Sequence, residues 1–184
     1  MHLLTLHKQF LTAHIKEGSR VCDFTMGNGH DTLFLAKAVG PTGHVTAFDI
    51  QPAAVENTQK RLLDEGVLSW CELICESHAN LAEYVKEPFD AGVFNLGWLP
   101  GSDKTVTTMR TSTEKAVRAA VELIAPGGIL LAAVYPGHPE GRAEGELLTA
   151  YFSTLDRYTY SCTRVNIVNS PDAPFFFAIE RRDG

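Results

Sequence analysis

Two hydrophobic periodicities alternate along the chain. Runs of about four to eight mostly apolar residues are typical of buried strands, and apolar positions three and four residues apart are typical of amphipathic helices. The first pattern predicts strands at residues 20–22, 44–49, 70–76, 89–96, 128–135, about 158–168 and 175–181. The second predicts helices at about 2–17, 33–39, 52–65 and 81–86, and around 111–124 and 147–155. Strand and helix therefore alternate five times before two final strands.

The ends of these elements carry recognisable signals. Gly18, Gly40 and Gly66 each follow a predicted helix, where glycine commonly ends one. Thr111 and Glu114 have the spacing of a capping box, which predicts a helix starting at Thr111. The short link 169–174 predicts that the last two strands pair antiparallel. The chain is therefore expected to be one α/β domain, residues 1–184, with a mostly parallel seven-stranded sheet, a terminal antiparallel strand and helices on both faces.

A glycine-rich turn between the first strand and the next helix is the strongest local signal. It reads Asp23-Phe-Thr-Met-Gly-Asn-Gly-His-Asp-Thr32. Gly27 and Gly29 allow a sharp turn and close approach of a ligand, and the helix behind them directs its N-terminal N–H groups at the loop. This layout is typical of a nucleotide-type cofactor site, and the loop predicts contacts from Asp23, Met26, Gly27, Asn28, Gly29, Asp31 and Thr32.

Two carboxylates indicate which cofactor fits. Asp49 ends the second strand 20 residues after Gly29, where an acidic residue accepts hydrogen bonds from ribose hydroxyls. The third glycine of the dinucleotide fingerprint is absent, because Thr32 occupies that place. Asp23 suits the ammonium of a methionine moiety and would repel a pyrophosphate. These features favour S-adenosylmethionine over NAD, and so does the terminal antiparallel pair, which is typical of class I methyltransferases with their Rossmann-like fold.

Further candidate residues lie at other strand ends. Ile50 is placed to stack on an adenine and Gln51 to reach the ribose or base edge. Ser77 and His78 follow the third strand, where they either contact the adenine or form a capped turn into the next helix. Asn95 ends the fourth strand, and its neutral amide suits an amine that is about to be alkylated.

Composition narrows the choice of partners. The net charge is −6, so any RNA contact must come from a local basic patch. The longest strongly apolar run, 129–135, is too short to span a bilayer, and no export signal opens the chain, so we expect a cytoplasmic protein without a membrane segment. Four cysteines without CxxC spacing are expected to pack in the core, with no metal site and no disulfide. The sequence leaves a homodimer open.

Three segments together resemble one bacterial family. They are 23–32, Asn95-Leu-Gly-Trp-Leu-Pro-Gly-Ser-Asp-Lys104 and Tyr135-Pro-Gly-His-Pro-Glu-Gly141, and the likeness extends over nearly the whole chain. The family is the YtqB/MnmM type, formerly described as rRNA methylases. The resemblance implies methyl transfer from S-adenosylmethionine to the amine of 5-aminomethyl-2-thiouridine, the wobble base in the tRNA anticodon loop. Relatives in this family carry Tyr in place of Trp98 and Gly in place of Ser102.

The implied reaction assigns roles within these segments. Asn95 would orient the amine, and Gly97 and Trp98 would shape the base pocket, with a hydrophobic plug as the other role open to Trp98. Asp103, His138 or water would take the proton. A group of cations near the loops would hold phosphates, unless they are merely solvated surface charges: Lys104, Arg110, Lys115, Arg118 and Arg142. The competing functions are a small-molecule or rRNA methyltransferase, a NAD-linked oxidoreductase and a non-catalytic nucleotide- or RNA-binding module.

Overall fold

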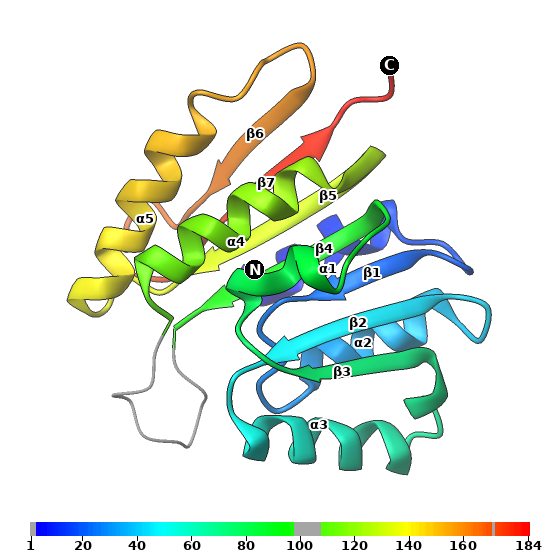
Figure 1. Cartoon of the computed structure of the whole chain (residues 1–184). Coiled ribbons are helices and arrows are strands. Elements are labelled where there is room, and N and C mark those ends of the chain that lie inside the picture. Colours follow the sequence, from blue (N-terminus) through cyan, green and yellow to red (C-terminus); the bar gives the residue numbers. More distant parts are fainter. Residues whose placement is uncertain (1–2, 98–107, 171) are drawn as a thin grey trace.

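A seven-stranded sheet forms the centre of the computed structural model, which describes residues 3–97, 108–170 and 172–184 (Figure 1). The strand order is β3-β2-β1-β4-β5-β7-β6. Neighbouring strands from β3 to β5 pair in parallel, and β7 is antiparallel to both β5 and β6. The strands are β1 (Arg20–Asp23), β2 (His44–Asp49), β3 (Cys71–Cys75), β4 (Phe89–Leu96), β5 (Ile124–Val134), β6 (Tyr160–Val165) and β7 (Phe175–Arg181). This confirms the predicted fold class, including the terminal antiparallel strand.

Helices cover both faces of this sheet. They are α1 (Leu3–His14), α2 (His30–Val39), α3 (Pro52–Asp64), α4 (Arg110–Glu122) and α5 (Pro139–Phe152), with short 3-10 segments η1 (Leu68–Trp70) and η2 (His78–Glu83). Alternate residues of the central strands point to opposite faces, which makes two separate cores. Phe94, Leu130 and Phe177 pack towards α4 and α5, whereas Val93 and Ile129 pack with side chains of α1, α2 and α3.

The order of the strands creates a crevice at one edge of the sheet. From β1 the chain adds β2 and β3 on one side, then returns to add β4 and β5 on the other. The connections after β1 and β4 therefore leave in opposite directions from neighbouring carboxyl ends, and ligands of open α/β sheets bind at such a point. Asp23, Asp49 and Asn95 all lie at this edge, as the sequence predicted.

The structure corrects the predicted capping box and the predicted helix at 81–86. Helix α4 begins at Arg110 with the extended residue Met109 as its N-cap, so Thr111 is already helical and forms no capping box. Its first turn is held instead by Glu140 of α5, which accepts a hydrogen bond from the Arg110 amide at 2.9 Å. In place of a helix at 81–86 there is the 3-10 segment η2, in which Asn80 leaves helical geometry.

Strand β5 also starts earlier than the glycines suggested. It pairs with β4 at Ile124 and again from Ile129, and the four residues between them form an irregular bulge that includes Gly127 at φ 74°. The glycines therefore bend the strand without preceding it.

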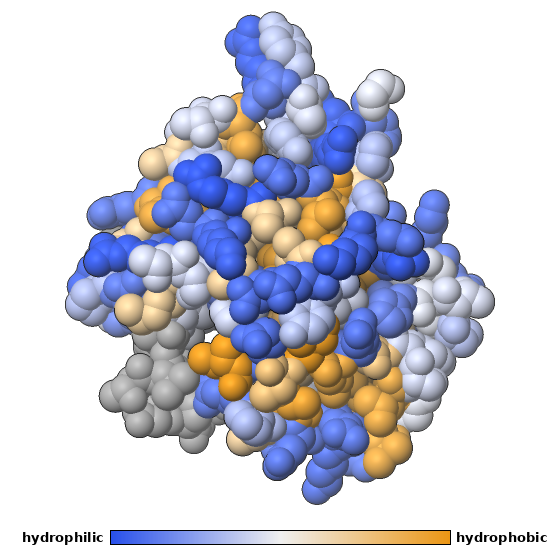
Figure 2. All heavy atoms as spheres, viewed as in Figure 1, coloured by the Kyte–Doolittle hydropathy of each residue, from blue (hydrophilic) through white to orange (hydrophobic). Residues whose placement is uncertain are grey.

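The surface and the cysteines complete the description. Figure 2 shows mainly hydrophilic residues over α4 and α5 and a larger share of hydrophobic residues over β2 and β3. All four cysteines are free, but only Cys22 is buried; Cys71 is half-buried, and Cys75 and Cys162 are exposed, so the prediction of core packing is wrong for those two. Within the described ranges, no helix is long and apolar enough to cross a membrane, and no three potential ligands group around a metal position.

Candidate functional site

The glycine-rich loop is held in shape by the neighbouring strand and helix. Gly27 and Gly29 have φ values of 51° and 76°, a region that residues with a side chain rarely adopt. A Cβ on Gly29 would lie 2.8–2.9 Å from atoms of Thr58 in α3, so no side chain fits between loop and helix. Asp49 accepts hydrogen bonds from the amides of Gly27 and Gln51, both at 3.0 Å. Burial raises the pKa of Asp49, and these two hydrogen bonds oppose that rise.

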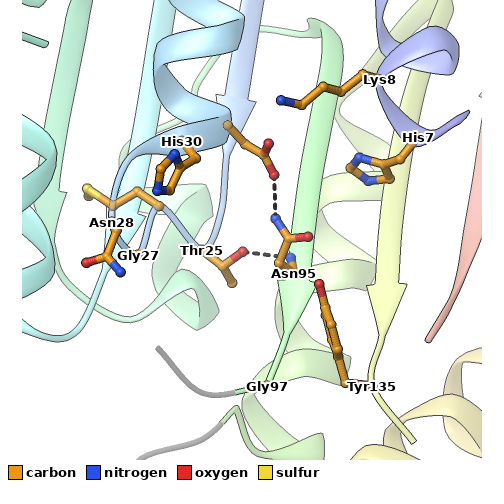
Figure 3. A pocket seen from close by; sticks show the side chains of 11 residues that line it. His7, Lys8, Thr25, Gly27, Asn28, His30, Asn95, Gly97 and Tyr135 are labelled. Carbon is orange, nitrogen blue, oxygen red and sulfur yellow. Dashed lines mark hydrogen bonds between the residues drawn. The ribbon is translucent and has the colours of Figure 1, made fainter. Parts of the chain in front are cut away.

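A cavity of about 600 Å³ opens beside this loop. Its walls come from α1, the β1–α2 loop, the start of α2 and the ends of β4 and β5. The lining residues are His7, Lys8, Thr25, Met26, Gly27, Asn28, His30, Asp31, Asn95, Gly97 and Tyr135 (Figure 3). Three of the walls thus belong to the sheet edge where the fold predicts a ligand, and α1 adds a fourth.

Asn95 is fixed in one orientation at the centre of this cavity. Its backbone N–H donates to the Thr25 hydroxyl at 2.7 Å, and its side-chain Nδ2 donates to Asp31 at 2.9 Å (Figure 3). A carboxylate only accepts hydrogen bonds, so the amide must turn its NH₂ towards Asp31 and its oxygen away. That oxygen accepts no hydrogen bond from the described residues. The end of β4 therefore presents one fixed acceptor to the cavity.

Tyr135 lies below this amide. Figure 3 shows its hydroxyl directed towards Asn95. Burial raises the pKa of Tyr135, and the negative charge of Asp31 raises it further, so the phenol stays protonated at neutral pH. It is available as a hydrogen-bond donor on the floor of the cavity.

Asp23 is fully buried beneath the loop and does not line the cavity. Its two oxygens accept hydrogen bonds from the Thr32 hydroxyl at 2.7 Å and the Thr25 amide at 3.2 Å. Burial, together with the nearby charges of Asp31 and Asp49, raises the pKa of Asp23 to about 7. This carboxyl joins the loop to the first turn of α2.

Helix α1 closes the cavity with two polar side chains. His7 is 2% exposed and packs edge-on against Phe176 of β7, with 5.4 Å between ring centroids. Burial lowers the pKa of His7, so its imidazole is neutral at pH 7. Beside it, Lys8 extends from the same helix into the cavity (Figure 3).

Comparison with known proteins connects this geometry to a family. The model of the family described as "Putative rRNA methylase" matches residues 45–180, about three quarters of the chain. The chain belongs to this family.

Individual relatives of this rRNA-methylase family agree. The chain is 37% identical over 180 residues to the chloroplastic tRNA (mnm(5)s(2)U34)-methyltransferase of Arabidopsis thaliana; this covers 92% of the chain but only 65% of that relative. A solved rRNA-methylase-type structure from Clostridium thermocellum superposes with a TM-score of 0.95 at 35% identity, covering 98% of each chain. A methyltransferase-type structure from Streptococcus mutans, solved in complex with SAH, gives 0.89 at 31% identity and the same coverage.

The structure gathers some of the predicted site residues and separates others. Met26, Gly27, Asn28, Asp31, Asn95 and Gly97 line one cavity. Gly29 and Thr32 are buried behind it, and Ile50 is 54% exposed at the end of β2, with Gln51 after it. Trp98, Asp103 and Lys104 lie outside the described residues, as does Ser102.

Ser77 and His78 form the capped turn that the sequence offered as one of two alternatives. The Ser77 hydroxyl accepts from the Ala79 amide at 3.2 Å. His78 is 8% exposed, and its Nδ1 lies 3.2 Å from the carbonyl oxygen of Phe24. Burial lowers the pKa of His78 to about 4, so it is neutral at pH 7. Their contact with an adenine stays a prediction.

His138 acts as a helix cap in this structure. Its Nδ1 accepts a hydrogen bond from the Gly141 amide at 3.1 Å at the start of α5. It does not line the cavity around Asn95. Its role as proton acceptor stays a prediction.

The candidate phosphate-binding cations are largely paired or engaged elsewhere. Arg118 lies 2.8 Å from Glu114, and Arg110 lies 3.7 Å from Glu140. The remaining two described ones, Lys115 and Arg142, donate to the Asn80 side chain and the Pro136 carbonyl. Only part of their charge is therefore left for a nucleic acid.

Five cavity residues were not predicted from the sequence: His7, Lys8, Thr25, His30 and Tyr135. One signal was present. His7 lies on the apolar stripe of the first helix, and a polar residue on a buried stripe needs either a partner or a role. Thr25 and Tyr135 carry no pattern of their own, because only the folded sheet brings them next to Asn95.

Proposed function

We propose that the protein is an S-adenosylmethionine-dependent N-methyltransferase that acts on the aminomethyl group of 5-aminomethyl-2-thiouridine at the tRNA wobble position. The Arabidopsis relative is named for this type of tRNA position, and the Clostridium thermocellum structure shares the fold over 98% of each chain. The observation that carries the proposal is the fixed amide oxygen of Asn95 beside the glycine-rich loop.

The residues of the loop fit this cofactor. Gly27 lines the cavity and has no side chain where a ligand would approach, and Gly29 lets the loop pack closely against Thr58 of α3. Asp49 uses one acceptor position on each oxygen for the loop amides, so lone pairs remain for ribose hydroxyls. The SAH complex of the Streptococcus mutans relative supports the same cofactor class.

Asn95 and its neighbours provide the alignment that the reaction needs. When bound, the cofactor supplies a methyl group already activated on a sulfonium, so positioning supplies much of the catalysis. The Asn95 oxygen would accept a hydrogen bond from the N–H of the incoming amine and fix the direction of its lone pair. Asp31 holds that oxygen in place through Nδ2. Positive charge moves onto the amine nitrogen during transfer, and an oxygen acceptor stabilises it.

The substrate amine must be neutral before it can attack. Alkylamines resemble lysine, with a pKa of about 10.4, and burial in a low-dielectric pocket lowers the pKa of an amine. Thr25, Met26, Tyr135 and the uncharged imidazole of His7 give part of the cavity this character. The Lys8 ammonium in the same cavity also favours the neutral amine, whereas the Asp31 carboxylate opposes it. A wobble base lies in a single-stranded loop, so turning it into a cavity costs little.

A methyl-transfer assay tests the proposal directly. The purified protein would be incubated with labelled S-adenosylmethionine and tRNA from cells that lack this methyl group, followed by nucleoside analysis. We expect label on the wobble nucleoside. Label in rRNA or in a free amine, with none in tRNA, would assign a different substrate. Absence of SAH binding by calorimetry would reject the cofactor as well.

A further inference from the structure

Two side chains of opposite charge line the cavity without pairing. Asp31 gives one oxygen to Asn95, and its other oxygen accepts no hydrogen bond from the described residues. Lys8 lies over the ring of Phe34, with Nζ 5.0 Å from the centroid, and forms no ion pair with any residue that the structure describes. Half-buried charges of this kind normally find partners, because removing them from water costs free energy.

Asp31 and Lys8 both lie close enough to His7 to affect its pKa. The negative charge of Asp31 raises the pKa of His7 and the positive charge of Lys8 lowers it, so both act on the same ring. The Nε2 of this 2%-exposed imidazole has no hydrogen-bond partner among the described residues. Figure 3 shows His7 and Lys8 both extending from α1 towards the side of the cavity where Asn95 lies. An anion at the start of α2 and a neutral imidazole and a cation on α1 therefore lie near one another in the cavity.

A ligand that pairs with both Asp31 and Lys8 must carry a positive and a negative charge close together. An inorganic phosphate would suit Lys8 but would be repelled by Asp31, and a simple amine would suit Asp31 but leave Lys8 unpaired. The α-ammonium and α-carboxylate of an amino acid lie on one carbon and meet both requirements. The cavity also adjoins Gly27 and Asn28, where the rest of an amino-acid-bearing nucleoside would continue.

We propose that Asp31 and Lys8 form a zwitterion clamp that binds the amino-acid end of the cofactor, with Asp31 on its ammonium and Lys8 on its carboxylate. This inference rests on the cofactor half of the proposed function and needs no assumption about the RNA. It makes α1 part of the cofactor site. It also separates the roles of two aspartates, since Asp23 is enclosed by Thr25 and Thr32 and Asp31 faces the cavity.

Calorimetry with three ligands tests each charge separately. S-adenosylhomocysteine carries both charges, its decarboxylated analogue carries only the ammonium, and 5′-deoxy-5′-methylthioadenosine carries neither. The variants are Lys8→Met, Lys8→Arg and Asp31→Asn. Lys16→Met is the matched control, because it removes the same charge from an exposed position just beyond α1.

The expected pattern is specific to each variant. Lys8→Met should weaken binding of S-adenosylhomocysteine roughly 10- to 100-fold, the range for a charge-assisted hydrogen bond, and leave the other two ligands unchanged. Asp31→Asn should weaken both ligands that carry the ammonium. Lys8→Arg should retain most of the affinity, and Lys16→Met all of it.

The outcomes that overturn the clamp differ from those that overturn the proposed function. A wild-type protein that binds no S-adenosylhomocysteine rejects the cofactor, and the clamp with it. If the wild type binds that ligand but Lys8→Met stays within twofold, only the clamp is rejected. Equal losses for all three ligands would also reject it, because they would indicate displacement of α1 and not loss of one charge.

Discussion

The carboxylates at the strand ends differ from the charged groups that line the cavity in where they find their hydrogen-bond partners. Asp23 and Asp49 end neighbouring strands, and both oxygens of each accept hydrogen bonds from the protein itself. Asp31 and Lys8 start on helices and keep open positions towards the cavity. The first pair shapes the loop before any ligand arrives, whereas the second pair is arranged for a partner that the protein does not supply. A residue near the glycine-rich loop can therefore either shape the loop or bind a ligand. The hydrogen bonds that it already makes within the protein distinguish these two roles.

The largest effect is expected at the fixed amide. Asn95→Ala removes the oxygen that faces the cavity and the donor that holds Asp31, so methyl transfer should slow roughly 100- to 1,000-fold, as when one transition-state hydrogen bond is lost. Single-turnover transfer to wobble-unmethylated tRNA measures this. Asn169→Ala, an exposed control, should keep the wild-type rate. A variant rate within threefold of wild type would remove Asn95 from the mechanism.

A variant of Asp49 tests whether a carboxylate whose oxygens both accept hydrogen bonds from the protein also binds the ligand. Asp49→Ala leaves the amides of Gly27 and Gln51 without their acceptor, so the free energy of unfolding should fall by about 1–3 kcal/mol. Loss of the ribose contact should also weaken binding of S-adenosylhomocysteine by at least roughly tenfold. Chemical denaturation and calorimetry separate the two effects. Lower stability with unchanged affinity would mean that Asp49 only shapes the loop.

Substitution of Asp23 should change how stability depends on pH and should not change cofactor affinity. Its pKa is about 7 in the folded protein against 3.8 for the free side chain, so the folded state binds the extra proton between these values. The stability that this proton contributes is present below about pH 4 and is lost as the pH rises through 7. Asp23→Asn should therefore gain stability relative to wild type as the pH is raised, on the order of a few kcal/mol. Thermal unfolding at pH 4.5 and pH 8 measures the difference, and an equal shift at both values contradicts it.

The smallest effect concerns the RNA side, where the cations are mostly engaged. Among the described residues, Arg142 donates to the neutral Pro136 carbonyl and forms no ion pair, so its charge is not neutralised there. Arg142→Ala should weaken tRNA binding a fewfold and lower the salt slope by about one, without changing cofactor affinity. Binding titrations at several salt concentrations test this. Arg118→Ala serves as the comparison, because Glu114 already pairs with that guanidinium and a smaller change is expected.

Most of the fold was readable from the sequence because local patterns determine it. The apolar run that ends at Asp49 and the glycines at 27 and 29 predicted both the strand and the turn. The start of α4 was not readable. A capping box is a local signal. The first turn of α4 is instead held by Glu140, which is 30 positions away from Arg110 and is brought near it only by the fold.

The site was partly readable for the same reason. Asn95 and Asp49 end strands, so sequence alone placed them at the ligand edge. Lys8 and Tyr135 come from a helix and a loop whose direction depends on packing, for example of His7 against Phe176. The pairing of Asn95 with Asp31 spans 64 residues and leaves no trace in either segment by itself.

The contact between the first helix and the seventh strand has a consequence for synthesis on the ribosome. Phe10 and His7 pack on Phe176, with centroid separations of 5.5 and 5.4 Å, and His14 lies 3.3 Å from Glu180. Helix α1 also packs against β4 and β5, but its docking surface is complete only when β7 has been translated. The glycine-rich loop is therefore synthesised long before its cavity is complete, and we expect α1 to close the cavity only after β7 leaves the exit tunnel.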